Sequence, residues 1–322
     1  MTKVQIISNK SDITSDFITK SLNKKGIEFY RFNTEELTKS VTFSLNFSSN
    51  SHQIKDSKIE KSFDLKDFTS VYYRRPKIPE FYSPELSPGE VNFIRNEFIY
   101  TLEGIYKLLR NAYWVSPIYS IREAENKIYQ LDIAKSLGFT IPNSIITNSH
   151  DQVSLFFKEN KEKCIIKPIK SGIIEDSVET KVVFTNILKT VPEKEEKVSS
   201  STNYIQSHIL KKGDVRVIVV GNKIFATLIH SQENSETKTD WRKGEMNLIH
   251  ERINLPEEIN SKCIFLLKTL KLRFGAIDFI LDGMGNYIFL EINPNGQWAW
   301  IEKQTGYNIT KEIVNLLQYE TF

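Results

Sequence analysis

GAIDFIL-DGMGN-YIFLEINPNG, residues 275–296, is the stretch of this chain that decides its fold. Its two apolar runs, residues 275–281 and 287–293, each have the length of a β-strand. The residues between them are rich in Asp, Asn and Gly, which is typical of the turn in a β-hairpin. The segment therefore predicts two antiparallel strands joined by a tight turn.

Three oxygen-bearing side chains can converge on one face of this hairpin. Because side chains alternate between the faces of a strand, Phe289, Glu291 and Asn293 are predicted to share a face, to which Asp278 points from the neighbouring strand. The apolar residues predicted on the opposite face are Ile288, Leu290 and Ile292. Polar side chains that simply face water are the alternative. Carboxylate and amide oxygens are the ligands that Mg²⁺ prefers, so the three together favour a metal site at Asp278, Glu291 and Asn293.

Length and composition exclude several classes of protein. The chain has 322 residues, of which 40% are hydrophobic and 26% charged, which is typical of a soluble globular protein with two or three subdomains. No apolar run reaches the length of about 18 residues that a membrane helix needs, and Met1–Ile7 lacks a signal-peptide core. A net charge of +3 is too small to indicate a nucleic-acid partner. Two cysteines cannot form a disulfide framework, so we expect a reducing cytoplasm.

Alternating strand-like and helix-like segments fill the first part of the chain, which is typical of a small α/β domain. The spacing of apolar residues predicts a helix over residues 91–110 and another over residues 122–137. Strand-like segments dominate from residue 163 onward. The fold class is therefore α/β (α+β), built from three consecutive pieces.

The ending Glu291–Pro294 (EINP) resembles the metal-binding strand of the ATP-grasp superfamily, which ends in Glu-x-Asn-Pro. The resemblance implies an ATP-grasp fold, with an N-terminal α/β pre-ATP-grasp domain followed by two α+β lobes that hold the nucleotide. The implied domains are residues 1–118, 119–202 and 203–322. ATP and Mg²⁺ are the implied cofactors.

The resemblance also implies a nucleotide site between the lobes. Lys127 lies in a segment that resembles the family's entry helix, whose lysine approaches the phosphates. Lys167 ends an apolar strand, in the sequence context where the family carries its nucleotide lysine. An unpaired ammonium in a buried strand is costly, and a phosphate partner would relieve that cost. The alternative is a lysine on an edge strand that faces solvent. Ser171 and Gly172 are implied contacts in a loop that is less rich in glycine than is usual in the family. The other implied contacts are Ile205, Gln206 and Ile209, in the segment between the lobes, and Leu290.

Asp214-Val215-Arg216 resembles the Asp-x-Arg strand of the RimK-type branch, and Arg242 resembles the second arginine of that family. Asp214 and Arg216 are predicted to share a strand face, where the carboxylate can hold the guanidinium. An ordinary salt bridge at Arg216 and a surface charge at Arg242 are the alternatives. The resemblance implies an acyl-phosphate ligase with Asp214, Arg216 and Arg242 as catalytic residues. The general base stays open between Asp214 and water.

Arg74-Arg75-Pro76, which follows aromatic residues, and the ending Glu291–Trp298 resemble the graspetide (microviridin-type) peptide ligases. These enzymes join Asp or Glu side chains of a ribosomal precursor peptide to Thr, Ser or Lys side chains. Adjacent strand residues point to opposite sides, so one of the two arginines is predicted to face the cleft. The residues implied to dock an acidic core peptide are Arg74 or Arg75, Lys170, Lys212, Arg216 and Arg242.

The same resemblance implies further partners. A leader segment of the precursor would bind the region Gly172–Asn186, which includes Glu175, Asp176 and Glu179, although a plain acidic loop fits as well. A homodimer is expected, with the helix at residues 91–110 either in its interface or packed internally. Two other functions stay open: a RimK-like ligase that adds a free amino acid to a protein or small acid, and a nucleotide-binding module without activity.

Overall fold

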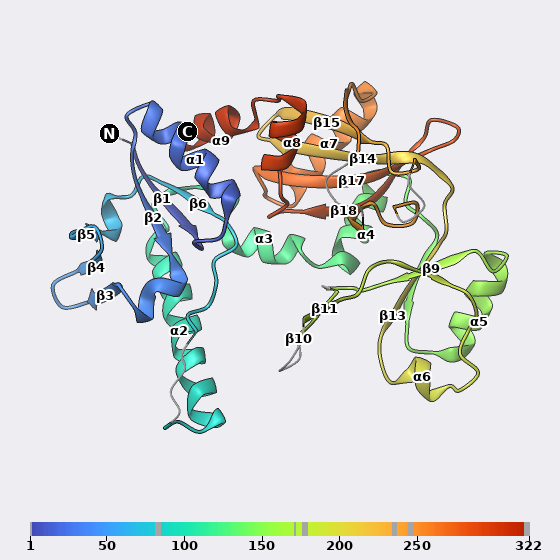
Figure 1. The fold of residues 1–322 in the computed structure, drawn as a ribbon, viewed down its shortest axis with the longest axis horizontal. Coiled ribbons are helices and arrows are strands. Elements are labelled where there is room, and N and C mark those ends of the chain that lie inside the picture. The colour runs from blue at the N-terminus through green and yellow to red at the C-terminus, as the bar shows by residue number, and fades with distance from the viewer. Residues whose placement is uncertain are drawn as a thin grey trace. The chain divides into compact units, whose positions relative to one another are not determined.

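The protein is described by a computed structural model over residues 2–80, 85–170, 172–175, 180–233, 237–243 and 248–318. It separates into two compact units, and most of their elements are labelled in Figure 1. The first unit is Met1–Ile118 with Gln297–Glu302 and Asn308–Phe322, and the second is Tyr119–Gly296 with Lys303–Tyr307. The three-domain division stays a prediction. Within the described ranges, no helix has both the length and the hydropathy that crossing a bilayer requires.

The first unit is built on a parallel sheet with the strand order β2-β1-β6-β7. Its strands are β1 (Lys3–Ser8), β2 (Glu28–Asn33), β6 (Ser70–Tyr73) and β7 (Tyr113–Val115). The antiparallel strands β3 (Val41–Asn46), β4 (Ser51–Asp56) and β5 (Lys61–Asp64) form a second sheet. The helices are α1 (Ile13–Lys24), α2 (Pro88–Leu108) and α9 (Ile309–Gln318), and α8 (Ala299–Thr305) begins in this unit.

Helices cover both faces of the parallel sheet, which is why β1 reads as an apolar run. Ile7 and Val71 pack into one hydrophobic cluster with Leu102 and Ile105 of α2. Helix α9 contacts β6 and β7 and lies beside α1 (Figure 1). The loop after β1 and the residues after β6 therefore meet at one edge of the sheet, because the carboxyl ends of neighbouring parallel strands lie together.

The second unit contains a four-stranded sheet with the order β12-β9-β13-β8 and the hairpin β10-β11. The strands are β8 (Ser144–Thr147), β9 (Cys164–Lys167), β10 (Ile173–Glu175), β11 (Thr180–Val182), β12 (Asn186–Leu188) and β13 (Asn203–Ser207). Helices α5 (His150–Glu159) and α6 (Glu196–Ser199) belong to this part. Phe156 and Phe157 of α5 pack with Cys164 and Ile205 on one face of the sheet.

A five-stranded antiparallel sheet with the order β16-β15-β14-β17-β18 completes the second unit. Its strands are β14 (Lys211–Val220), β15 (Lys223–Ile229), β16 (His250–Ile253), β17 (Phe274–Asp282) and β18 (Tyr287–Asn293). Helix α7 (Glu257–Thr269) packs on one face, where Leu267 would meet a Cβ atom at Gly275. The predicted hairpin at residues 275–293 is therefore present as β17 and β18.

Strict alternation along β18 was the wrong expectation. Phe279 pairs with Phe289 and Asp278 pairs with Glu291, so Leu290 is an extra residue that forms a β-bulge. Phe289 packs on Phe279 and Phe139 and does not share the face of Glu291. Without the bulge, Leu290 would lie opposite Asp278. The extra residue is thus what brings the two carboxylates together across the strands.

The single helix predicted over residues 122–137 is two helices, α3 (Ile118–Ala124) and α4 (Lys127–Ser136). Asn126 separates them because its side-chain oxygen accepts hydrogen bonds from the backbone N–H groups of Ile128 (3.0 Å) and Tyr129 (3.2 Å). This is a helix N-cap, and it places Lys127 at the first position of α4.

Candidate active site

A row of charged side chains crosses the five-stranded sheet on the face away from α7. Arg216 of β14 pairs with Asp278 of β17, which pairs in turn with Glu291 of β18. The Nη1 atom of Arg216 lies 2.6 Å from Oδ2 of Asp278. Burial and the neighbouring Glu291 raise the pKa of Asp278, and the Arg216 guanidinium opposes that rise. The row therefore sets two carboxylates side by side with one arginine.

Three cations surround Glu291. The Nζ atom of Lys127 lies 3.1 Å from Oε2 of Glu291 and also donates to the carbonyl of Pro168 at 3.1 Å. Burial alone would raise the pKa of Glu291, but the charges of Lys127, Lys167 and Arg242 outweigh it and hold that pKa below its usual value. Glu291 is therefore the anion around which two lysines and an arginine gather.

Lys167 lies at the end of β9, on the face of its sheet that is opposite the α5 cluster. It pairs with Tyr204 of β13, and its Nζ atom lies 5.1 Å from the centroid of that ring. Burial lowers the pKa of Lys167 to about 8. The positive charges of Lys127 and Arg242 add to this effect, and the negative charge of Glu291 opposes it. A phosphate placed here would meet an ammonium that has lost much of its hydration.

Arg242 is held by Asp240, two residues earlier in the same loop. Its Nε and Nη2 atoms lie 2.8 and 2.7 Å from the two carboxylate oxygens of Asp240. Asp240 also accepts from the backbone N–H of Thr185 at 3.3 Å, which anchors the pair. The hydrogen bonds that Arg242 donates to Asp240, together with the charges of Asp240, Glu291 and Asp278, raise the pKa of Arg242. Asp240 was not predicted as a partner of Arg242, although it lies only two residues before it in the sequence.

The expectation that Asp214 holds Arg216 was wrong. Both oxygens of Asp214 accept from Nζ of Lys211, at 2.9 and 2.7 Å, and the hydroxyl of Ser231 donates to one of them. Burial raises the pKa of this carboxyl group. Directly opposed residues of neighbouring strands have Cβ atoms about 5 Å apart, closer than residues two apart on one strand, so Asp278 is the nearer partner for Arg216.

The remaining residues expected at a nucleotide site are spread over the second unit. Gln206 is fully buried, and its amide donates to Ser144 (2.8 Å) and Tyr204 (2.6 Å). Ile205 packs under α5, on the face opposite Lys167. Ile209 and Leu290 are half-buried. Lys170 and Lys212, which were expected to dock the core peptide, are exposed. Ser171 lies outside the described residues.

Gly172 is required by a close approach of the backbone. A Cβ atom at this position would lie 1.9 Å from the carbonyl oxygen of Val183, and the Gly172 carbonyl accepts from the Val183 N–H at 2.5 Å. Gly296 is required in the same way, because its Cβ would lie 2.3 Å from that of Ala276 and 2.8 Å from Nη2 of Arg216. The guanidinium of Arg216 therefore passes directly over this glycine.

The donor set at the end of β18 fits a hard divalent cation. Asp278 and Glu291 supply neighbouring carboxylates; burial and, after it, the charge of Glu291 raise the pKa of Asp278, and a bound cation would oppose that rise. Asn293 is exposed, and its Oδ1 accepts from the N–H of Asn295 at 3.0 Å. Among the described residues, no group of three or more His, Cys, Asp or Glu side chains forms a metal site. The candidate site is therefore two carboxylates and one amide.

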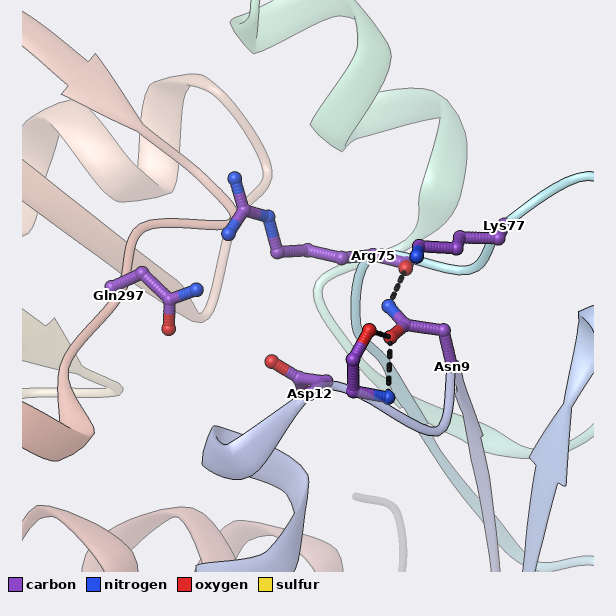
Figure 2. Close-up of a pocket in the computed structure, with 6 residues that line it drawn as sticks. Asn9, Asp12, Arg75, Lys77 and Gln297 are labelled. Carbon is purple, nitrogen blue, oxygen red and sulfur yellow. Dashed lines mark hydrogen bonds between the residues drawn. The ribbon is translucent and has the colours of Figure 1, made fainter.

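The first unit has a pocket of about 300 Å³ at the edge where β1 and β6 end, lined by Asn9, Ser11, Asp12, Arg75, Lys77 and Gln297. Figure 2 shows the Arg75 side chain reaching toward Gln297. The carbonyl of Arg75, a residue with a positive φ of 48°, accepts from Nδ2 of Asn9 at 2.6 Å. In the described part of the chain, neither Arg75 nor Lys77 has an ion pair. Lys77 is a cation that sequence analysis missed, two residues beyond Arg75.

Arg74, the neighbour of Arg75, does not line the pocket and is 1% exposed. Its Nη2 atom donates to Oε1 of Gln297 at 2.9 Å, and its Nε atom lies 3.6 Å from Oδ2 of Asp12. Of the two adjacent arginines, Arg75 therefore lines the pocket and Arg74 supports its wall from within the unit.

Comparison with known families agrees with this geometry. The RimK-like ATP-grasp domain family matches residues 124–317, and the MvdD pre-ATP-grasp domain family matches residues 3–122. The chain therefore belongs to the RimK-like ATP-grasp family and is an ATP-grasp ligase with a pre-ATP-grasp domain. The family resemblance, the α/β fold class and the enzyme class read from the sequence are confirmed, and ATP and Mg²⁺ are cofactors that fit this family.

Two solved structures are similar over nearly the whole chain. A Chryseobacterium gregarium RiPP-associated ATP-grasp ligase, in complex with ADP and a leader and core peptide, is 30% identical with a TM-score of 0.91, covering 98% of this chain and 96% of its own. The macrocyclase MdnC from Microcystis aeruginosa MRC, bound with the precursor peptide MdnA, is 25% identical with a TM-score of 0.85, covering 98% and 99%. A probable alpha-L-glutamate ligase of Haemophilus influenzae is 21% identical over 207 residues, and the chain spans 64% of its length.

Proposed function

We propose that this chain is an ATP-dependent macrocyclase that links acidic side chains of a ribosomal precursor peptide to its hydroxyl or amine side chains. The observation that carries the proposal is the row Arg216–Asp278–Glu291, because it sets a metal-binding carboxylate pair among Lys127, Lys167 and Arg242. Such a mixture of anions and cations suits a metal–phosphate ligand and little else. The similarity to two peptide-bound ligases supports a peptide as the second substrate.

The reaction proceeds in two displacements. An Asp or Glu carboxylate of the peptide attacks the γ-phosphorus of ATP, so that an acyl phosphate forms and ADP leaves. A Thr or Ser hydroxyl, or a Lys amine, then attacks the acyl carbon, and inorganic phosphate leaves with the bond electrons and takes up the proton that the nucleophile loses. The peptide thereby loses one water for each ester or amide formed.

The protein contributes charge neutralisation and positioning to both displacements. Asp278, Glu291 and Asn293 would hold Mg²⁺, which supplies charge neutralisation at the phosphates. Lys127 and Lys167 bind phosphate oxygens, whereas Arg216 and Arg242 present guanidinium groups to the transferring phosphoryl group and the activated carboxylate. Asp240 keeps Arg242 in place through its two hydrogen bonds.

The pocket of the first unit suits the acidic core of the peptide, because Arg75 and Lys77 offer two cations at its rim. A leader site over Gly172–Asn186, a homodimer and a cytoplasmic location stay predictions. The exposed Phe93 and Tyr100 of α2 are compatible with a dimer interface.

Incubation of the protein with ATP, Mg²⁺ and the product of a neighbouring short acidic, threonine-rich reading frame tests the proposal. We expect the peptide to lose the mass of one water per bond formed, with one ADP released for each loss. An unmodified peptide under conditions where ATP is consumed would contradict it.

A ligase that adds a free amino acid is the second candidate, favoured by the similarity to the probable alpha-L-glutamate ligase. The same assay with free glutamate distinguishes the two functions. A gain of one glutamyl residue in an acceptor protein or peptide, in place of water loss, would support this alternative.

Replacing Arg75 by Ala should impair use of the peptide more than binding of ATP. Loss of a charge-assisted hydrogen bond of about 2 kcal/mol should raise the KM for the peptide by about 10- to 100-fold. The KM for ATP should stay within about twofold, since no phosphate contact is removed. Arg110→Ala, which removes an exposed arginine outside the pocket, is the control. Equal losses for peptide and ATP would exclude this role for Arg75.

The affinity for ATP should fall above pH 8. Lys167 is protonated below its pKa of about 8 and attracts phosphate, whereas above that pH it becomes neutral and the attraction is lost. Below pH 8 the contribution of Lys167 to ATP affinity is complete. Isothermal titration calorimetry between pH 6.5 and 9.5, a range that spans the pKa of Lys167, should therefore show an ATP affinity that is constant at low pH and declines at high pH. Lys167→Arg keeps its charge over this range and should abolish the decline. A wild-type affinity that does not change between pH 7 and 9.5 would contradict the prediction.

A further inference from the structure

We propose that Gln130, on α4, is a positioning residue that holds the metal-ligand strand by its backbone. The inference rests on the proposed function, in which Glu291 and Asn293 bind Mg²⁺. Ile292 stands between these two residues, and Gln130 binds both of its backbone polar groups. Oε1 of Gln130 accepts from the Ile292 N–H at 3.0 Å, and Nε2 donates to the Ile292 carbonyl at 2.8 Å.

The orientation of the Gln130 amide is determined by a third hydrogen bond. Nε2 also donates to the carbonyl of Ala124, at the end of α3, at 2.5 Å. Both hydrogens of Nε2 therefore point at carbonyl oxygens, and a reversed amide would set its own oxygen against them. The side chain is 3% exposed, so water does not replace these bonds easily. Gln130 thus acts as a rigid link between α3, α4 and β18.

Helix α4 holds the strand at a second point. Lys127 and Gln130 are three residues apart and lie on the same helix face. Lys127 binds the carboxylate of Glu291, while Gln130 binds the backbone of the next residue. Helix α4 lies beside β18 (Figure 1), and the cap at Asn126 determines where both side chains project.

Strand β18 needs such support because of its position and its bulge. It is the last strand in the order of its sheet, where backbone groups lack a strand partner on one side. The bulge at Leu290 interrupts the pairing with β17 one residue before Glu291. A one-residue slip would bring Leu290 opposite Asp278 and move Glu291 away. By pairing with Ile292, Gln130 opposes that slip and keeps the carboxylates of Asp278 and Glu291 adjacent.

Hydrogen exchange of the Ile292 amide tests the link without nucleotide or metal. In the wild-type protein this amide should exchange slowly, and in Gln130→Met at least about tenfold faster. The Phe289 amide, which donates to Thr140 at 2.8 Å, is the internal reference and should change little. Gln5→Met is the matched control, since Gln5 is fully buried and its amide has no hydrogen-bond partner among the described residues. Fast exchange of Ile292 in the wild-type protein would overturn the inference, and this measurement needs no variant.

Titration of the ADP-bound protein with Mn²⁺, followed by electron paramagnetic resonance, tests the consequence for the metal. Gln130→Met should weaken Mn²⁺ binding by about 10-fold, the lower end of what supporting residues contribute to metal sites. ADP affinity in the presence of a chelator should change less than about threefold in that variant, because no phosphate contact is removed.

The outcomes separate the two proposals. Absence of Mn²⁺ binding at β18 in the wild-type protein would remove the metal site and the proposed function, while the exchange experiment would still report on Gln130. Wild-type binding that Gln130→Met leaves within about twofold would overturn the positioning role alone. If Gln130→Met does not fold, Gln130→Glu is the second variant. It keeps the shape of the side chain and the oxygen that accepts from the Ile292 N–H, but it loses the N–H donors of the amide. It should also weaken Mn²⁺ binding.

Discussion

Glu291→Gln should abolish ligation, with a loss in kcat of about 10³-fold or more. The substitution keeps the shape of the side chain and removes one negative charge. That charge is the centre of the site, because it faces Lys127, Lys167 and Arg242 and is a proposed ligand of Mg²⁺. The neutral amide is a poorer ligand for a hard cation than a carboxylate, so neutralisation of the transferring phosphoryl group is lost.

The same variant should be less stable than the wild type when no nucleotide is bound. Three cations would then face one another without the carboxylate that compensates them. ATP should restore part of the melting temperature, since its phosphates replace the missing charge. Peptide mass spectrometry and ADP release measure the activity, and Glu257→Gln, at an exposed position in the first turn of α7, is the control. Turnover above one tenth of the wild-type rate would remove Glu291 from the catalytic site.

Arg216→Ala should reduce ligation by about 10³- to 10⁵-fold, the range in which an arginine at a phosphoryl-transfer site acts. The variant removes a guanidinium and also leaves Asp278 beside Glu291 without its cation. The pKa of Asp278, already raised by burial and by Glu291, should rise further, because the charge that favours the carboxylate is removed. One substitution therefore damages two parts of the site.

Arg216→Lys separates the two effects, because it restores a positive charge without the planar fork. We expect the lysine variant to recover binding of Mn²⁺ and nucleotide but to remain at least about tenfold slower in ligation. The Nη2 atom of Arg216 would lie 2.8 Å from a Cβ atom at Gly296, so the absence of a side chain at Gly296 is what accommodates the guanidinium. Ligation by Arg216→Ala at the wild-type rate would show that the Asp-x-Arg strand has only a structural role.

Short-range patterns in the sequence predicted much of the fold. The two apolar runs around an Asp- and Gly-rich turn predicted the hairpin, and the ending at Glu291–Pro294 indicated the family, which the comparisons confirm. That one of Arg74 and Arg75 faces the cleft stays a prediction; in the first unit Arg75 lines a pocket and Arg74 is buried. These inferences depend on residues close together in the chain, whose geometry is a property of a single strand or turn.

Partners across strands were decided only by the tertiary structure. Asp214 and Arg216 share a face, yet Arg216 pairs with Asp278, and Glu291 reaches that pair only because Leu290 is a bulge. Gln130 binds a strand 162 positions away in the sequence, and nothing in its own segment indicates this. Periodicity is encoded by neighbouring residues, so the amino-acid sequence alone indicated the hairpin, and its motifs indicated the ligase family. Register and side-chain pairing depend on the packing of segments far apart in the chain, and these contacts exist only once the sheets and α4 have assembled.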